Sequence, residues 1–175
     1  QALFSELLGD IYEASYQPDR WPLVIEKICR ITQSHSGGLF IQDLSLKEAN
    51  AHYQYGMSEQ MLIDYTNHRH HDPAFAIMQR RAVGEAVNIQ GADQHTLESH
   101  DYYEGVRLKN DLGYLAGANV INNEMYMVGL GLHRSFAARG YDEDTLQLIA
   151  ELIPHLQRAL HIHRCLLYTS DAADE

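Results

Sequence analysis

Cysteine, long apolar runs and clustered basic residues are scarce in this 175-residue chain, and each scarcity excludes a class of protein. With only Cys29 and Cys165, the chain lacks the disulfide framework of small secreted domains. No apolar run approaches the length of a membrane span, and the N-terminus has no signal-peptide pattern. Thirteen Lys and Arg against 24 Asp and Glu give a net charge of −11, which disfavours a nucleic-acid surface. We therefore expect a cytoplasmic protein that does not enter a membrane.

Catalytic signatures are missing as well. The chain has no glycine-rich phosphate loop of the right spacing and no nucleophile elbow. Its length is sufficient for one domain with a substantial core. We therefore expect a single non-enzymatic domain without a cofactor. Two alternatives stay open: a scaffold that only dimerises and has no pocket, and a metal-dependent enzyme that rests on a group of histidines.

That group consists of His68, His70, His71 and Asp72. On a helix, His68 shares a face with His71 and Asp72, which would allow a metal site of two histidines and one carboxylate. Asp72 precedes Pro73, however, and proline disfavours helix at the residue before it. Three interpretations stay open: a metal-dependent enzyme that uses His68, His71 and Asp72, a ligand site, or a helix end where histidines meet the dipole and Asp72 caps the next helix.

Residues 112–133 predict a β-hairpin at the centre of the fold. Two apolar runs flank Asn122-Asn123, and asparagine tolerates the left-handed backbone of tight turns. With a two-residue loop, Ala118 would face Met127, and one face of the hairpin would be nearly bare. The small residues on that face would be Ala116, Ala118, Gly129 and Gly131. Either a closely packed helix or a ligand would fill the space above them.

The remaining apolar patterns predict helices at both ends of the chain, and both strands and helices between them. Helices are expected over residues 3–12, 19–31, 58–72, 74–81, 100–110 and 142–164, and strands over 39–44, 51–56 and 82–89. The fold class is therefore an α+β sandwich, with an antiparallel sheet of about five strands, the terminal helices on one face and the middle helices on the other.

The last helix carries an apolar stripe whose members alternate steps of three and four residues, as in a coiled coil. The stripe consists of Leu146, Ile149, Ile153, Leu156, Leu160 and His163. We expect a homodimer through this helix. The alternative is that the same stripe packs on the sheet or on the first helix.

The end of the chain differs in kind from the rest. Residues 165–175, CLLYTSDAADE, resemble the translation of a sequencing adapter, so we set them apart from residues 1–164. Without them, 21 acidic residues stand against 13 basic ones. We expect the natural reading frame to continue beyond Arg164.

Four segments together resemble the N-terminal sensory domain of LuxR-type helix-turn-helix transcriptional regulators, which is GAF-like or PAS-like. They are LLGDIYEASYQPDRWPLVIEKI, HDP at residues 71–73, HDYYEGVRLKNDLGY and LIPHLQRALHIHR. The resemblance implies a small-molecule effector and a DNA-binding module after Arg164 that this chain lacks. DNA would be contacted only through that missing module.

In the acyl-homoserine-lactone receptors, a relative of this domain, a tyrosine and a tryptophan precede an Asp-Pro pair whose carboxylate holds the ligand amide. Only Asp72-Pro73 matches here, because Glu59 and Ile63 stand where the aromatic residues would be expected. The resemblance therefore leaves the ligand class open.

The sequence also predicts which side chains form the ligand pocket. Aromatic residues and a soft methionine suit a mainly apolar pocket with few polar groups. We expect the lining to be Tyr65, Phe75, Tyr103 and Met127, with His68 or Asp72 as the polar handle.

Overall fold

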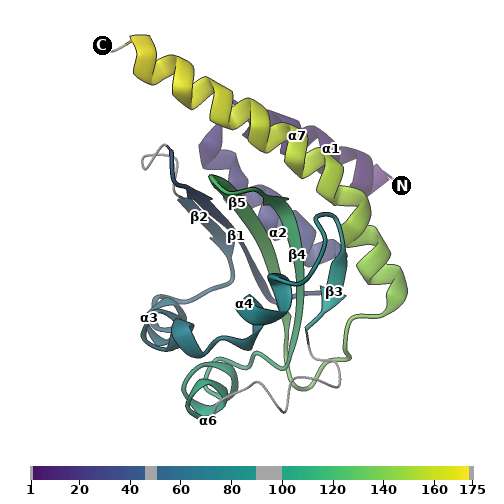
Figure 1. Ribbon diagram of the computed structural model, residues 1–175. Coiled ribbons are helices and arrows are strands. Elements are labelled where there is room, and N and C mark those ends of the chain that lie inside the picture. Colours follow the sequence, from purple (N-terminus) through teal and green to yellow (C-terminus); the bar gives the residue numbers. More distant parts are fainter. Residues whose placement is uncertain (1, 46–50, 90–99, 174–175) are drawn as a thin grey trace.

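An antiparallel sheet of five strands forms the middle layer (Figure 1). The computed structural model describes residues 2–45, 51–89 and 100–173, except the side chains of residues 75, 76, 100 and 171–173. Across the sheet the order is β2-β1-β5-β4-β3. The strands are β1 (Ser36–Asp43), β2 (Ala51–Tyr55), β3 (Ala86–Asn88), β4 (Tyr114–Asn122) and β5 (Tyr126–Arg134). This is the α+β sandwich that the sequence predicts.

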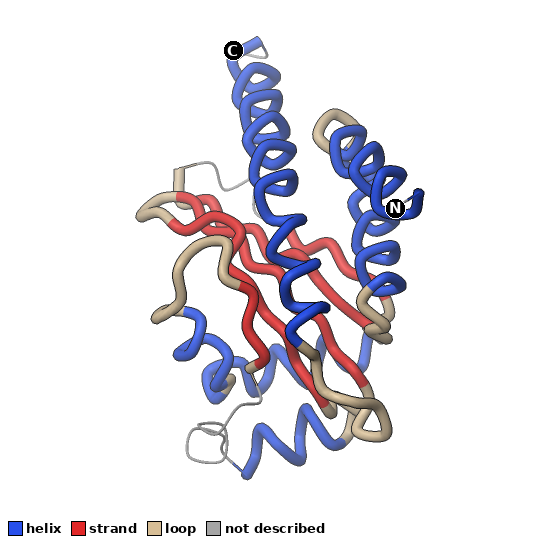
Figure 2. The backbone as a smooth tube through the Cα atoms, turned by 90° about the vertical axis from the view of Figure 1, so that its right-hand side faces the viewer, coloured by secondary structure: helices blue, strands red, loops and turns tan. Residues whose placement is uncertain are grey.

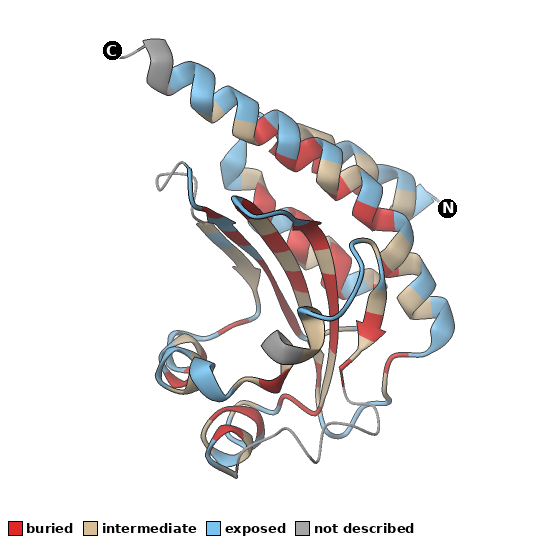
Figure 3. Cartoon of the chain, in the orientation of Figure 1, coloured by how far each residue is buried: buried red, intermediate tan, exposed pale blue. Residues whose placement is uncertain are grey.

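The helices at the two ends of the chain cover one face of this sheet (Figures 1 and 2). They are α1 (Ala2–Ala14), α2 (Trp21–Ile31), which follows the short η1 (Pro18–Arg20), and α7 (Glu143–Ala173). The apolar stripe of α2 is buried as predicted, and the Trp21 ring stacks on Tyr53 of β2 with 6.1 Å between centroids. Figure 3 shows that the main core lies between this layer and the sheet.

The helices from the middle of the chain lie on the opposite face (Figure 1). They are α3 (Glu59–His68), η3 (Arg69–His71), α4 (Pro73–Met78), α6 (His100–Tyr102) and η4 (Tyr103–Leu108), which is a π-helix. They share a second, smaller core of Met57, Met61, Tyr102, Val106 and Leu112. The middle layer therefore has an apolar core of its own.

The central hairpin forms, but its predicted register is wrong. Asn123 accepts hydrogen bonds through Oδ1 from the backbone N–H groups of Met125 and Tyr126, at 3.0 and 2.8 Å, and closes a loop of residues 123–125. A bulge between Asn119 and Ile121 adds one residue to β4. Because side chains alternate along a strand, these two features move the pairing away from that of a two-residue loop.

The corrected register changes which small residues share a face. Ala116 and Ala118 belong to the main core beneath the terminal helices. Gly117 pairs directly with Gly131, so the small residues on the other side of the sheet are glycines from neighbouring strands. The expectation that both alanines share this surface with Gly129 and Gly131 is incorrect.

Helix α7 uses its apolar stripe inside the domain. Ile149, Ile153, Leu156 and Leu160 are all buried in the main core, and α7 packs against α1 and β4. The stripe is therefore part of the domain core, as the alternative interpretation expects, and the homodimer through this helix stays a prediction. Residues 165–173 continue the same helix. No helix in the described ranges has the length and apolarity needed to cross a membrane.

Candidate functional site

The sheet face toward the middle helices is open near its centre. Gly129 of β5 lies opposite Phe40 of β1, and Gly131 lies opposite Gly38. Among the described residues, a Cβ atom added at Gly129 would meet no atom within 4 Å, and one at Gly131 would meet only the Phe40 ring, at 3.8 Å. Phe40 is itself 38% exposed. Within the described part of the chain, neither a helix nor another side chain therefore packs directly on these two glycines.

The Phe40 ring borders this open floor and has an aromatic neighbour. It stacks on the imidazole of His52 from β2, with centroids 4.3 Å apart and planes 13° apart. Gly117, farther along the same face, is covered, because a Cβ there would lie 2.8 Å from Ile89 and 3.2 Å from the sulfur of Met78. The open floor is thus limited to the β1–β5 part of the sheet.

Tyr65 and Asp72, two of the predicted site residues, meet where α3 gives way to α4. The Tyr65 hydroxyl donates to Oδ2 of Asp72 at 3.0 Å, and the backbone N–H of Ala74 donates to Oδ1 at 2.8 Å. Asp72 therefore caps α4, as one of the three interpretations expects. Burial raises the pKa of Tyr65 far above its usual value, so the phenol remains a hydrogen-bond donor at neutral pH.

The histidines near this junction do not converge on one point. Nδ1–H of His68 donates to the backbone oxygen of Asp64 at 2.7 Å, and the other side of the ring faces Gly105 of η4. The rings of His70 and His71 pack on each other at 4.1 Å. Within the described ranges, no three His, Cys, Asp or Glu side chains are placed to hold a metal ion. The geometry therefore gives no support to a metal-dependent enzyme.

The other predicted lining residues lie on three different elements, η4, β5 and α4. Tyr103 packs edge-on against Phe136 at 6.2 Å, and the Arg107 guanidinium lies 5.5 Å from each of these two rings. Met127 is half-buried on β5, while Phe75 belongs to α4 with a side chain outside the described part. The structure brings Tyr65 and Asp72 together, and the full set of six remains a prediction.

A carboxylate fastens α3 to the segment that follows η4. Asp64 accepts hydrogen bonds from the Lys109 ammonium at 2.7 Å, from Asn110 at 3.1 Å and from Gln60 at 3.0 Å. The hydrogen bond from Lys109 is the main cause that lowers the pKa of Asp64 to about 2. The middle layer is thus held by a charged contact in addition to its small core.

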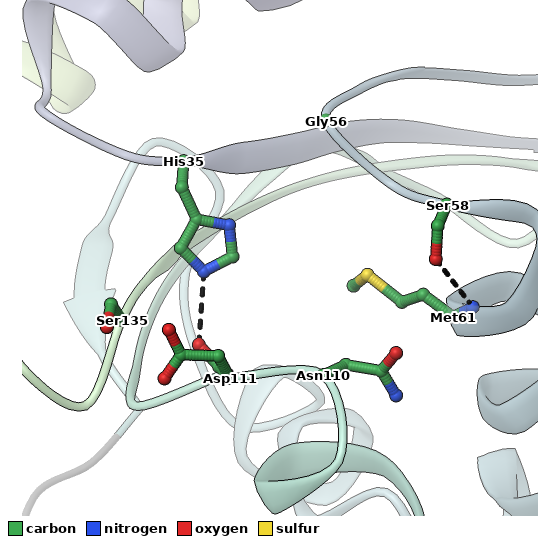
Figure 4. A pocket seen from close by; sticks show the side chains of 7 residues that line it. All are labelled: His35, Gly56, Ser58, Met61, Asn110, Asp111 and Ser135. Atoms are coloured by element: carbon green, nitrogen blue, oxygen red, sulfur yellow. Dashed lines mark hydrogen bonds between the residues drawn. The ribbon is translucent and has the colours of Figure 1, made fainter.

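A cavity of about 300 Å³ opens at the end of the sheet where β1 begins and β5 ends (Figure 4). Its lining consists of His35, Gly56, Ser58, Met61, Asn110, Asp111 and Ser135. None of the five predicted site residues with a described side chain lines it. Sequence reasoning missed it because the lining comes from segments far apart in the chain. Asp111, whose φ of 53° is uncommon for a residue with a side chain, gives no sequence signal by itself.

No family model matches the chain, and no curated protein is significantly similar to it in sequence. The fold itself is GAF-like. A GAF domain/HD domain protein from Geobacter sulfurreducens matches with a TM-score of 0.60 and 8% identity, over 90% of this chain and 98% of that one.

Ligand-binding domains of the LuxR family share the same fold. The LBD domain of VqsR from Pseudomonas aeruginosa matches with a TM-score of 0.68 and 15% identity, over 93% of this chain and 97% of that one. CepR2 from Burkholderia cenocepacia, described as an N-acylhomoserine lactone dependent LuxR family transcription factor, matches with a TM-score of 0.62 and 11% identity, over 91% and 94%. At these identities the likeness establishes the fold.

Proposed function

We propose that residues 1–164 form the sensory domain of a LuxR-type transcriptional regulator. The domain binds a small-molecule effector between the sheet and the middle helices, and it controls a helix-turn-helix module that follows Arg164. The observation that carries this proposal is the end-to-end likeness to the VqsR LBD domain, which covers 93% of this chain and 97% of that one. No catalytic role is proposed.

The open floor at Gly129 and Gly131 supports an effector site in this layer. Ligand sites are mostly apolar concavities with a few polar groups, and here two bare glycines lie beside an exposed aromatic ring. The Tyr65–Asp72 pair is the polar group that we assign to the helical side of the site. Because Glu59 and Ile63 replace the aromatic residues of the lactone receptors, the proposal names no lactone.

Two comparisons with SdiA of Escherichia coli support a module beyond this domain. The fragment SdiA1-171 matches with a TM-score of 0.56 and 15% identity, over 90% of this chain and 87% of that one. A longer SdiA chain matches with a TM-score of 0.53 and 13% identity, over 87% of this chain but only 62% of that one. The region that this domain matches is thus only a part of the longer SdiA chain.

A buried ion pair offers a route from the sheet to that module. Nε of Arg164 donates to Oδ2 of Asp43 at 2.6 Å, and Asp43, the last residue of β1, is fully buried. The guanidinium also lies 4.7 Å from the ring of Tyr126. Since β1 carries Phe40 on the open floor, a ligand that shifts β1 would act on the residue from which the module continues.

The test fills the floor in the full-length regulator. Gly129→Leu places a side chain where a Cβ meets no atom within 4 Å, so the domain should fold normally. We expect it to abolish the response of a promoter reporter to an organic extract of spent culture medium. Gln147→Leu, which adds the same side chain on the exposed surface of α7, should leave the response intact.

Two outcomes would contradict the proposal. A full reporter response from Gly129→Leu, at wild-type thermal stability, would exclude the floor as the effector site. A locus in which residue 164 is followed by a catalytic domain would remove the regulator assignment.

A further inference from the structure

The cavity at the end of the sheet is lined by different residues from those of the proposed effector site. None of Phe40, Gly129 and Gly131 lines it. Its seven described lining residues come from the residue before β1, the turn after β2, the start of α3, the segment after η4 and the turn after β5. An inference from this cavity therefore goes beyond the proposed function and concerns a second ligand.

The walls of the cavity are fixed by tightly packed backbone. Gly56 has a φ of +73°, and a Cβ there would lie 2.2 Å from the backbone oxygen of His35. Nε2–H of His35 donates to the backbone oxygen of Asp111 at 3.1 Å (Figure 4). A Cβ at Gly113 would lie 2.1 Å from the backbone nitrogen of Phe136. Such close approaches leave the backbone around the cavity little freedom to move.

Charge in the cavity is negative. Among the described lining residues, with histidine counted neutral, Asp111 is the one with a formal charge at pH 7. Its Oδ1 accepts the backbone N–H of Phe136 at 3.1 Å. The hydrogen bond from Ser135 is the main cause that lowers the pKa of the Asp111 carboxyl below its usual value, so the group stays ionised. Asp111 is exposed, and its carboxylate can accept further hydrogen bonds from a ligand.

The other lining groups offer acceptors and one apolar surface. The amide nitrogen of Asn110 already donates to Asp64 and to the backbone oxygen of Val106, so its carbonyl oxygen is what it can present to a ligand. The Met61 side chain extends toward the middle of the cavity (Figure 4). Methionine adapts its shape to apolar groups and aromatic rings.

We propose that this cavity binds a small molecule that carries a protonated primary amine next to an apolar group. The ammonium sits on the carboxylate of Asp111, and the apolar group packs against Met61. The volume of about 300 Å³ lies at the lower end of the range for small-molecule sites, which limits the ligand to a compact molecule.

The experiment compares three probes of the same length with different charge. The 175-residue chain, labelled with ¹⁵N, is titrated with phenethylamine, 2-phenylethanol and phenylacetate, and the backbone amides are followed by NMR. Phenethylamine should cause saturable shifts at Asp111, Met61 and Phe136. Because a solvent-exposed ion pair is worth little, we expect about five-fold weaker binding of the alcohol. The carboxylate should cause no shifts there.

Asp111→Asn is the decisive variant, because asparagine also tolerates a φ of 53° and keeps an oxygen for the N–H of Phe136. It should lower the affinity for phenethylamine to that for the alcohol. Glu124→Gln, which removes the same charge in the loop before β5, should bind like the wild type. Equal binding of the three probes, unchanged affinity in Asp111→Asn, or shifts confined to other residues would each overturn the proposal.

Discussion

Replacing Asp64 by Asn should loosen the middle layer while leaving the terminal helices in place. The carboxylate is nearly buried and joins α3 to Lys109 and Asn110 beyond η4. Asparagine has almost the same shape but no charge. The substitution therefore removes the charge and one of the two acceptor oxygens without creating a cavity.

The size of the effect follows from the pKa. The pKa of Asp64 falls from 3.8 to about 2, and a shift of this size corresponds to at most about 2.4 kcal/mol of stability at neutral pH. Because the Lys109 side chain is 53% exposed, solvent screening reduces our expected value to about 1–1.5 kcal/mol. The folded-state pKa lies below the unfolded value, so this contribution is present above pH 3.8 and is lost as the pH falls toward about 2.

Urea unfolding of the wild type and of Asp64→Asn, at pH 7 and at pH 3, measures how much the Asp64 charge stabilises the domain and how this contribution changes with pH. The difference in unfolding free energy should shrink at pH 3, and hydrogen exchange at pH 7 should show lost protection in α3 and η4. Asp144→Asn, an exposed carboxylate in the first turn of α7, is the matched control and should change stability by less than about 0.5 kcal/mol. A difference that is as large at pH 3 as at pH 7 would refute the electrostatic explanation.

Three further outcomes can be checked by thermal or urea unfolding. Gly37→Ala should cost about 1–3 kcal/mol, because its Cβ would lie 2.7 Å from Leu132, whereas Gly129→Ala should change stability by less than about 1 kcal/mol; equal effects would contradict the open floor. Asp72→Ala should cost about 1 kcal/mol through the lost cap of α4, and a neutral result would deny the cap. Asp43→Asn should cost about 1–3 kcal/mol, because it removes a buried hydrogen-bonded carboxylate, and wild-type stability would show that this contact is weak.

Local pattern was enough to predict most elements and both layers. The spacing of apolar residues in α2 and in the strands can be read from the sequence. It matches the faces that are buried in the folded domain, because each element turns one apolar face toward the core. Ser58 as the cap of α3 is equally local, since its hydroxyl accepts the N–H of Met61 at 3.1 Å. The full set of six pocket residues was harder to predict. A hydrogen bond joins Tyr65 to Asp72, which are close in sequence, but where Tyr103 and Met127 lie relative to them depends on how distant segments pack.

What the sequence by itself determined, therefore, is the set of elements and the faces that each must bury. Tertiary structure decided their partners. The hairpin register depends on the Asn123 loop and on a bulge that places both Val120 and Ile121 in the core. The α7 stripe packs on α1 and the sheet of its own domain. The sequence could not decide this, because an identical stripe would suit packing against a second helix equally well. The cavity at Asp111 exists only in the folded chain, since distant segments must meet to form it.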